Sequence, residues 1–555
     1  MNFKFVTLAS CLLLGYSIQP VAGELDINPS ISASLIRSQN NSVSFEESDA
    51  SILSIKPSLS TSYNSKYWVG SLSVDHSQIQ SDTTNGSQGN SFTNYQYSSD
   101  IFLIEDILSV RLAGGQSYRS ILASQYFVND PFLGGDDLSK TQNNAANLLF
   151  NIAPRKYFGL NVNAGLSKVK SDRSSDIDPV NDISAGLENE LDNENKSLQM
   201  SFYQGREFSQ LSWNITASHQ NTVRTNRNDL TSRLMRGDIG LGLFSNVRLV
   251  LTGQSEENDL VNNAIFSNQD GNYDSYGAGL SWDSGTSRSF RVTYNRANRS
   301  ATNEKENFVA IDLNWRFTSR TSVQASIGKR FFGDSGNFSL THNTKHLRTQ
   351  IGYTETVTTF SRLITNPEDQ GVFVCPGNAS SFGDCILPPN LSNELQPGEE
   401  SSNLLVQIPE ISEEAILRKS LNARFGLSGK RTTSALNFRH TNTESLESIK
   451  NQNTDVISLN NSFKANNRTS FNLSLSYAST DEESTGIKTE TISSSFGISR
   501  QLGQKMSANL DFRYLDRSST NADLDLDLDL DLDFINQRNS DLTDRRLTLE
   551  FVYDF

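Results

Sequence analysis

Two cysteines in the middle of the chain are the residues whose type and spacing most directly indicate chemistry. Cys375 and Cys385 lie close together in a long polar segment, 358–412. In a protein exported to an oxidising compartment, an even and closely spaced pair favours one short disulfide loop. A zinc site would need further Cys or His ligands nearby, and the sequence has none there. The sequence therefore predicts a disulfide and no metal site.

The segment 358–412 that holds these cysteines is the longest polar connection in the chain. Connections of this length are usually functional or disordered. One hypothesis is that the segment folds inward and constricts a pore, held by Cys375 and Cys385. The alternative is a flexible external loop with an incidental disulfide, and the sequence favours neither.

The histidines are scattered along the chain, and their arrangement indicates no catalysis. His342 and His346 have no Cys or Asp residues around them in a ligand pattern. Serine is so abundant that pairing one Ser with one His carries almost no information about a hydrolase. No glycine-rich nucleotide signature follows a strand and opens a helix. The sequence thus predicts neither an enzyme nor a cofactor, and an outer-membrane hydrolase stays a third alternative.

A low-complexity run near the C-terminus alternates aspartate and leucine. Residues 523–534 read DLDLDLDLDLDF. In an extended strand, Asp523–Asp533 would present a ladder of carboxylates about 7 Å apart on one face, which could collect calcium. Calcium sites normally also need turns with glycine and carbonyl ligands, and the run has neither. The sequence favours the other interpretation, a hairpin that extends beyond a membrane.

The first 23 residues have the pattern of a signal peptide. Lys4 supplies a small positive charge, Phe5–Tyr16 is an apolar stretch of suitable length, and small residues precede Glu24, where we place cleavage. A lipoprotein signal around Cys11 is the alternative. That signal needs its apolar run before the cysteine, whereas here Leu12–Leu14 follows it. The pattern predicts export, with a mature chain that starts at Glu24.

Composition excludes several classes of protein. The net charge of −15 has the wrong sign for a nucleic-acid binder. No run of about 18 or more apolar residues is present to form a transmembrane helix. Only 35% of the residues are hydrophobic, which is little for several globular cores, yet 31 Phe and 16 Tyr are too many for a disordered chain. A transmembrane β-barrel of a Gram-negative outer membrane fits both facts, because its outer face is apolar and its interior can be polar.

Apolar and polar residues alternate along almost the whole mature chain, which is typical of strands with one apolar face. In the last segment, Leu547, Leu549, Phe551, Tyr553 and Phe555 alternate with polar residues. A final strand that ends in Phe is typical of outer-membrane barrels, where it serves as a signal for the barrel-assembly machinery. Tyr553 and Phe555 are therefore the predicted assembly signal.

The alternating segments number about 24, with an uncertainty of about two strands on either side (22–26), from residues 25–37 to residues 545–555. Short connections alternate with long ones, which is typical of bacterial barrels with periplasmic turns and extracellular loops. The first strand follows the cleavage site too closely for a plug domain. Tight turns are predicted at 64–65, 105–106, 154–155, 205–206, 283–285, 319–320, 429–430 and 503–504. Long loops are predicted near 38–50, 79–92, 119–142, 170–194, 258–271, 358–412 and 517–541.

All four tryptophans lie within a few residues of a predicted short turn, in the apolar register. They are Trp68, Trp213, Trp282 and Trp315. Their position predicts an aromatic girdle at the periplasmic face of the membrane. A secreted solenoid or a string of sandwiches is the alternative all-β fold, but the chain has no fixed-period repeat and little Gly/Pro punctuation.

Two segments near the middle of the chain carry a family resemblance. Residues 328–340 read GKRFFGDSGNFSL and residues 347–359 read LRTQIGYTETVTT. This resembles the outer-membrane β-barrel family associated with PEP-CTERM and exosortase systems, which is found alongside exopolysaccharide genes. Lys329–Ser335 matches the family's Gly-x-Arg-Phe-aromatic-Gly-Asp-Ser turn, and Tyr353–Glu355 matches its Tyr-x-Glu strand end. The family usually has an aromatic residue just before that Tyr, where this chain has Thr349–Ile351.

The resemblance implies a barrel linked to export or surface display of polysaccharide, and it implies no catalytic residues. We therefore expect a porin-like channel whose lumen of Ser, Asn, Thr and Gln binds sugars weakly at many places. Expected partners are outer-membrane lipid, the barrel-assembly machinery, polysaccharide and periplasmic export components. A structural or adhesive surface barrel with a closed lumen is the alternative.

Overall fold

A computed structural model of the chain describes residues 23–42, 45–83, 86–120, 138–172, 192–208, 210–225, 228–244, 246–259, 271–285, 287–299, 305–359, 372–376, 399–403, 414–483, 486–520 and 541–555. Within these ranges, no helix has the length and apolar character needed to cross a bilayer. The predicted signal peptide up to Ala22, Cys385 and the run 523–534 lie outside the described residues.

The described chain is built from strands. Those from the first half are β1 (Glu24–Ser42), β2 (Phe45–Asn64), β3 (Trp68–Thr83), β4 (Gly86–Ile104), β5 (Leu108–Ser120), β6 (Leu138–Ile152), β7 (Phe158–Asp172), β8 (Asn193–Gln204), β9 (Leu211–Arg224), β10 (Leu230–Phe244), β11 (Val247–Asn258), β12 (Tyr273–Asp283) and β13 (Arg288–Arg299). Those from the second half are β14 (Lys305–Thr318), β15 (Thr321–Arg330), β16 (Gly333–Asn343), β17 (Leu347–Thr358), β18 (Val372–Pro376), β19 (Glu399–Asn403), β20 (Ile416–Ser428), β21 (Thr432–Ser445), β22 (Asn451–Asn466), β23 (Thr469–Glu482), β24 (Ile487–Gln501), β25 (Met506–Thr520) and β26 (Leu542–Asp554).

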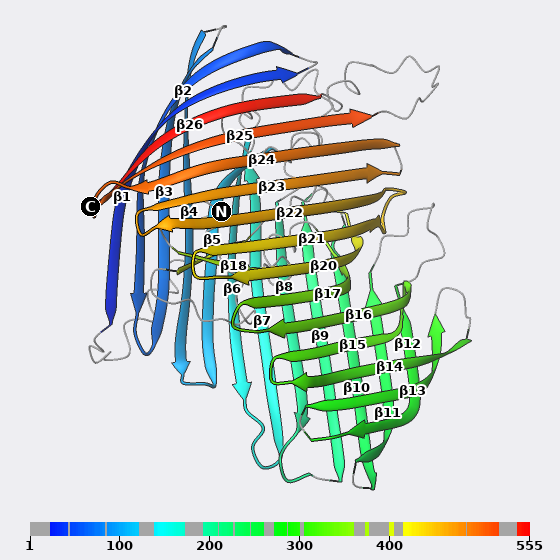
Figure 1. Cartoon of the computed structure of the whole chain (residues 1–555). Helices are drawn as coiled ribbons and strands as arrows, with labels where there is room; N and C mark the ends of the chain where they lie inside the picture. The colour runs from blue at the N-terminus through cyan, green and yellow to red at the C-terminus, as the bar shows by residue number, and fades with distance from the viewer. Residues whose placement is uncertain are drawn as a thin grey trace, which may run out of the picture.

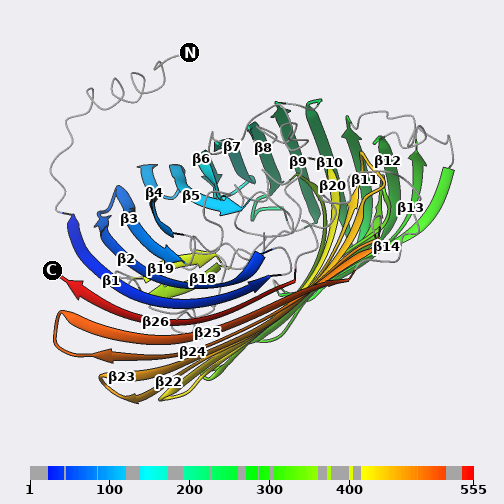
Figure 2. The same cartoon turned by 90° about the horizontal axis from the view of Figure 1, so that it is seen from above.

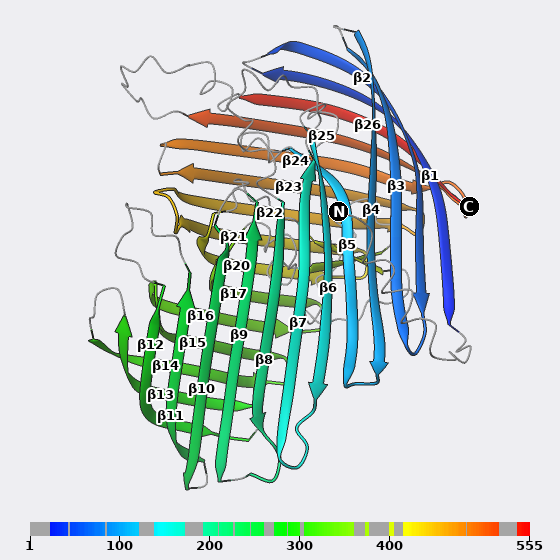
Figure 3. The ribbon, with the colours of Figure 1, turned by 180° about the vertical axis from the view of Figure 1, so that it is seen from behind.

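Twenty-four of these strands form one closed antiparallel ring. Each strand pairs with its neighbour in the chain, β17 pairs with β20, and β26 pairs with β1 from Ser30 opposite Asp554 to Ser42 opposite Leu542. The sheet therefore has 24 strands and no free edge, as the alternation predicted. Seen from opposite sides, β3 to β12 form one wall and β14 to β26 form the other, and the two walls cross steeply (Figures 1 and 3). From above, the ring is elongated rather than round (Figure 2).

The two faces of the ring differ in chemistry. On β26, Leu547, Phe551 and Tyr553 lie on the outer face and are exposed, while Arg546 on the inner face is buried. The same division holds around the ring, since large exposed Leu, Ile, Phe and Tyr side chains occur on most strands. A closed antiparallel sheet with an apolar exterior satisfies its own backbone hydrogen bonds and is suited to lipid. The protein is a multi-pass β-barrel of the outer membrane.

The ring has a short-turn end and a long-loop end. All eight predicted tight turns fall between strands at the short-turn end, where the chain also enters β1 and leaves β26. Three further connections at this end were not predicted, namely 244–247, 343–347 and 466–469.

Two predicted loops are wrong. Most of 38–50 belongs to β1 and β2, and most of 79–92 belongs to β3 and β4, which continue to pair in register beyond the ring's middle. The residues there are mainly Ser, Asn and Gln, which suggested loops. A backbone ladder does not depend on apolar side chains, so paired strands can extend beyond a membrane with polar residues on both faces.

Only small parts of the segment 358–412 are described. Residues Val372–Pro376 and Glu399–Asn403 pair as the two-stranded hairpin β18–β19. Two perpendicular views place this hairpin between the walls, within the outline of the ring (Figures 1 and 2). This position agrees with the hypothesis that the segment folds inward.

Candidate functional site

At the long-loop end, opposite walls of the ring touch through a buried ion pair. Arg224, the last residue of β9, places Nη2 2.8 Å from Oε1 of Glu447, which lies between β21 and β22. The two side chains are 1% and 6% exposed. Arg224 also donates from Nε to the carbonyl of Asn228 at 2.7 Å. A pair so shielded from water holds the two walls at a fixed distance.

The connection that carries Glu447 is itself fixed by hydrogen bonds. Ser445 Oγ accepts the backbone N–H groups of Glu447 and Ser448, at 3.2 and 3.0 Å. Glu414 Oε2 accepts the hydroxyl groups of Ser445 and Ser448, at 2.5 and 2.7 Å. The position of Glu447 therefore follows from the turn and not from the ion pair alone.

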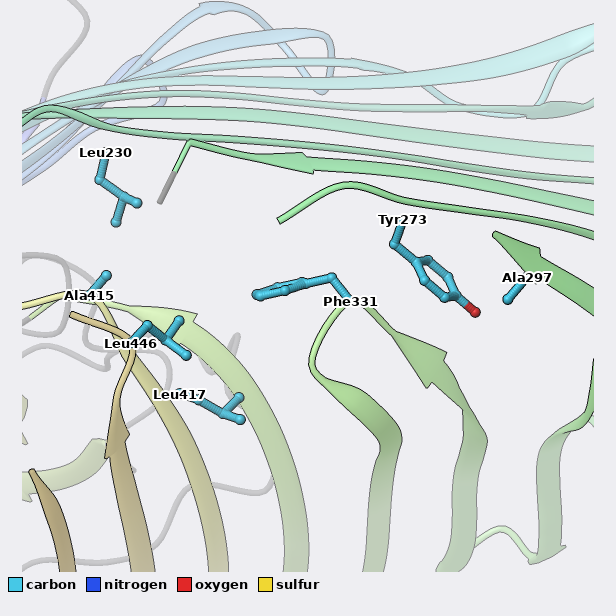
Figure 4. Packing of buried hydrophobic residues seen from close by; sticks show 7 residues of the cluster. All are labelled: Leu230, Tyr273, Ala297, Phe331, Ala415, Leu417 and Leu446. Atoms are coloured by element: carbon cyan, nitrogen blue, oxygen red, sulfur yellow. The ribbon is translucent and has the colours of Figure 1, made fainter. Parts of the chain in front are cut away.

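An apolar cluster that includes Leu446, the residue before Glu447, also joins the two walls. It consists of Leu230, Tyr273, Ala297, Phe331, Ala415, Leu417 and Leu446. The Phe331 ring points into the gap between Leu230 of one wall and Leu446 of the other (Figure 4). We call the Arg224–Glu447 pair together with this cluster the clasp. It divides the ring into a smaller arc, β10 to β21, and a larger arc, β22 to β26 with β1 to β9.

The β15–β16 hairpin supplies Phe331 and reaches into the smaller arc. Arg330 makes a bidentate ion pair with Glu256 of β11. Its Nε donates to Oε2 at 3.1 Å, and its Nη2 donates to Oε1 at 2.5 Å. The Glu256 side chain is fully buried. The Arg330 guanidinium also lies 5.0 Å from the ring centre of Phe332. The hairpin is thus held against β11, across the mouth of the smaller arc.

The residues that carry the family resemblance form one structural unit here. Glu355 Oε2 accepts the backbone N–H of Gly336 at 3.1 Å, beyond the last paired residues of β16 and β17. Its Oε1 accepts the Tyr353 hydroxyl at 2.5 Å. Gly333 has a φ of 118°, which L side chains rarely adopt. The Tyr-x-Glu strand end therefore supports the base of the hairpin whose tip is Arg330–Gly333.

The inner face of β20–β26 is polar and, at the long-loop end, largely buried. Along β20–β26 it carries buried hydroxyl, amide and guanidinium groups from Arg418, Ser420, Arg439, Thr441, Thr454, Ser458, Asn460, Ser462, Asn472, Thr480, Thr491, Arg517 and Arg546. Arg439 Nε donates to Asn422 Oδ1 at 2.5 Å. The predicted lumen of Ser, Asn, Thr and Gln did not include these arginines. No local pattern distinguishes an inward Arg from one on the outer face outside the membrane.

The four predicted girdle tryptophans lie at the short-turn ends of their strands. Trp68 is half exposed, and Trp282 stacks on Trp315 at 5.7 Å between ring centres. The ring centres of Trp213 and Phe208 are 4.7 Å apart. At the C-terminus, Tyr553 and Phe555 meet edge to face at 5.1 Å, and the Phe555 N–H donates to the Pro29 carbonyl at 3.1 Å. Their roles as girdle and assembly signal stay predictions.

The short-turn end also carries an exposed ion pair between neighbouring turns. Lys66 Nζ lies 3.0 Å from Glu105 Oε2. The hydrogen bond to Glu105 raises the pKa of Lys66. Both side chains are more than half exposed, so the pair contributes little to stability.

The other singled-out residues do not form a site. Cys375 lies in β18, while its predicted partner Cys385 lies outside the described residues. The ring nitrogens of His342 and His346 contact Thr321 Oγ1 at 2.8 Å and the Ser428 carbonyl at 2.9 Å. Within the described ranges, no three His, Cys, Asp or Glu side chains are grouped so that they could hold a metal ion.

Comparisons with known proteins give distant structural likenesses. No family model and no curated protein matches the chain. The chain is similar to the siderophore receptor PirA from Pseudomonas aeruginosa (8% identity, 95% of this chain and 80% of that one, TM-score 0.34). It is also similar to the FrpB iron transporter from Neisseria meningitidis, F3-3 variant (9% identity, 96% of this chain and 81% of that one, TM-score 0.40). A third similar structure is a loop-deletion mutant of OmpT, an outer membrane protein of Vibrio cholerae (7% identity, 96% of this chain and 100% of that one, TM-score 0.28). Likenesses this weak carry no argument about what the chain binds or does.

Proposed function

We propose that this barrel is a channel for a polar solute and that it serves the export or surface display of polysaccharide. The observation that carries the proposal is the continuous polar inner face of β20–β26. Hydroxyl and amide groups bind sugar hydroxyls weakly at many places, so a solute can move along such a wall without being trapped. The family resemblance of residues 328–340 supports polysaccharide as the solute.

In this proposal the short-turn end faces the periplasm and the long-loop end faces the outside, without a plug domain. The start of β1 and the end of β26 then lie on the periplasmic side, where periplasmic export components would meet the barrel. The solute would pass through the larger arc, because the clasp and the Arg330–Glu256 pair occupy the mouth of the smaller one.

A barrel with a closed lumen, acting in structure or adhesion, is the second candidate. The clasp favours it, since two opposite walls that touch leave less space for a solute. An outer-membrane hydrolase is the third reading. The contacts of His342 and His346 with a threonine hydroxyl and a backbone carbonyl give it no support.

Single-channel conductance of the refolded full chain in planar bilayers separates the first two candidates. A channel through the larger arc gives a steady conductance, and the Glu447→Ala variant, in which Arg224 loses its partner, gives a larger one. The matched control is the double variant Arg224→Met/Glu447→Leu, which keeps an apolar contact across the clasp and should conduct like the wild type. Silence of all three proteins, each folded by heat-modifiable gel mobility, would reject the channel in favour of the closed barrel.

A further inference from the structure

We infer that the inner face of β24–β26 contains a binding site for an oxyanion, centred on Arg517, and that the solute of the channel therefore carries carboxylate groups. The inference rests on the proposed channel and names the chemical class of its solute. It predicts an acidic oligosaccharide as the ligand, with its carboxylate on Arg517 and its hydroxyls on the neighbouring polar wall.

Register places the arginines of β25 and β26 together on the inner face. Leu510 and Phe512 are exposed on the outer face, so Arg513 and Arg517 point inward. Arg517 lies opposite Thr491 of β24, and Arg513 lies opposite Arg546 of β26. Three guanidinium groups thus share the inner face of two adjacent strands, β25 and β26.

Arg517 is buried with hydrogen-bonding capacity left over. Its relative exposure is 2%, and that of Thr491 is 6%. Among the residues that the structure describes, Arg517 Nε and Nη2 and Thr491 Oγ1 have no hydrogen-bond partner. Buried donors without acceptors are costly, and a guanidinium is the most costly of them because it stays charged. A carboxylate beside Arg517 would accept hydrogen bonds from Nε and Nη2 in the bidentate geometry that arginine favours.

Charged groups of both signs lie on the face around Arg517. Directly opposed like charges such as Arg513 and Arg546 destabilise a strand pair. The same face also carries acids. Asp544 is fully buried, accepts a hydrogen bond from Ser38 at 2.8 Å and lies 3.3 Å from Arg546. Asp511 and Glu550 share the inner face of β25 and β26, and Asp541 interacts with Arg517. These carboxylates offset the arginines of the face, so the observation that indicates an anion site is the pair of unpartnered nitrogens, Nε and Nη2, of buried Arg517.

A second group of arginines lies further along the same wall. Arg418 and Arg424 of β20 and Arg439 of β21 point inward, and the inner faces of β22–β24 between the groups carry mainly Ser, Thr and Asn. With strands about 4.8 Å apart, the two groups are separated by roughly 20 Å. A flexible oligomer with several acidic groups can reach both, whereas a single small anion cannot.

The test measures binding of a tetragalacturonate to the refolded full chain by calorimetry, with a neutral maltotetraose and inorganic sulfate as comparison ligands. We expect binding of the tetragalacturonate, little binding of the maltotetraose, and at least a tenfold loss for Arg517→Gln. Arg37→Gln is the matched control, because Arg37 lies on the outer face with 61% exposure. Thr491→Val, which removes a single uncharged group, should weaken binding by a smaller factor.

Several outcomes would overturn the inference. The first is equal binding of the tetragalacturonate and the maltotetraose. The second is binding of the tetragalacturonate that neither Arg517→Gln nor Thr491→Val changes. The third is equally strong binding of sulfate alone, which would show a generic anion site. Conductance separates this result from the proposed function. A conducting wild type that fails to bind tetragalacturonate refutes the solute class only, whereas a silent protein that binds it refutes the channel only.

Discussion

At the scale of single residues, the buried acidic side chains at the long-loop end depend on their ion-pair partners more than the exposed ones do. The Glu256 side chain has lost all its contact with water and accepts two hydrogen bonds from Arg330 and a longer one from Asn258 Nδ2 at 3.3 Å. Its neighbour Glu257 points to the outer face, where its pair with Arg233 is more than half exposed on both sides. Removing one partner of a buried pair leaves an uncompensated charge, whereas an exposed pair contributes little.

We therefore predict that Glu256→Ala destabilises the barrel by roughly 3–5 kcal/mol, because Arg330 then stays partly buried without its acid. Glu257→Ala, one position away, should cost at most about 1 kcal/mol. Urea titration of the refolded barrel in detergent, followed by tryptophan fluorescence, measures the free energy of unfolding of both variants. Equal and small losses for the two variants would show that the Arg330 pair does not hold the hairpin.

Gly333 gives a second prediction at this scale. A Cβ at this position would meet no atom within 4 Å, so backbone strain at a φ of 118° is the expected effect of Gly333→Ala. That strain should cost about 1–3 kcal/mol and loosen the hairpin. Gly503→Ala is the control, since a Cβ there also meets nothing within 4 Å but the backbone is not in that region. Proteolysis of the folded barrel by chymotrypsin, with cleavage at Phe331 and Phe332, would detect the loosening; equal cleavage of both variants would contradict it.

At the scale of strands, much of the fold could be predicted from the sequence and the clasp could not. Strands such as β26 alternate apolar and polar residues with period two, and Gly or Asn residues mark turns such as 64–65 and 503–504. Such patterns are local. Arg224 and Glu447 are far apart in sequence and ordinary in their surroundings, so only the closed ring brings them together. The resemblance of residues 328–340 pointed to the hairpin without indicating that it folds across the lumen.

The last strand gives a prediction at this scale. If Tyr553 and Phe555 form the assembly signal, Phe555→Ala should lower the amount of folded barrel in outer-membrane fractions several-fold. Asp554→Asn, which changes the adjacent residue but keeps its shape, should not. Heat-modifiable mobility of the membrane fraction measures the folded amount. Normal assembly of Phe555→Ala would leave the terminal aromatic residue with a packing role only.

At the scale of the whole molecule, the ring does not depend on the chain between β17 and β20. These two strands pair directly along the full length of β17, from Leu347 to Thr358. The hairpin β18–β19 lies within the outline of the ring without belonging to its sheet (Figure 2). We therefore expect the ring to form without the segment between β17 and β20.

Replacing residues 364–410 by a short Gly/Ser linker should leave a folded, heat-modifiable barrel. If the segment constricts the channel, conductance of this variant should exceed that of the wild type. Reduction of Cys375 and Cys385 should act in the same direction but less strongly, because it frees the segment without removing it. A folded variant with unchanged conductance would place the constriction elsewhere, at the clasp.

The pairing of β1 with β26 also sets the order of events in time. Ser38 donates to Asp544 across a separation of 506 positions, and β1 has no second neighbour until β26 arrives. Contacts between distant parts of a chain are slow to form, because the loop must close before they contribute any stability. Every hairpin can form as soon as its own strands are available, but the first strand must wait for the last. We therefore expect closure to be the slow step in the folding of this barrel, with the edge of β1 unpaired until it occurs.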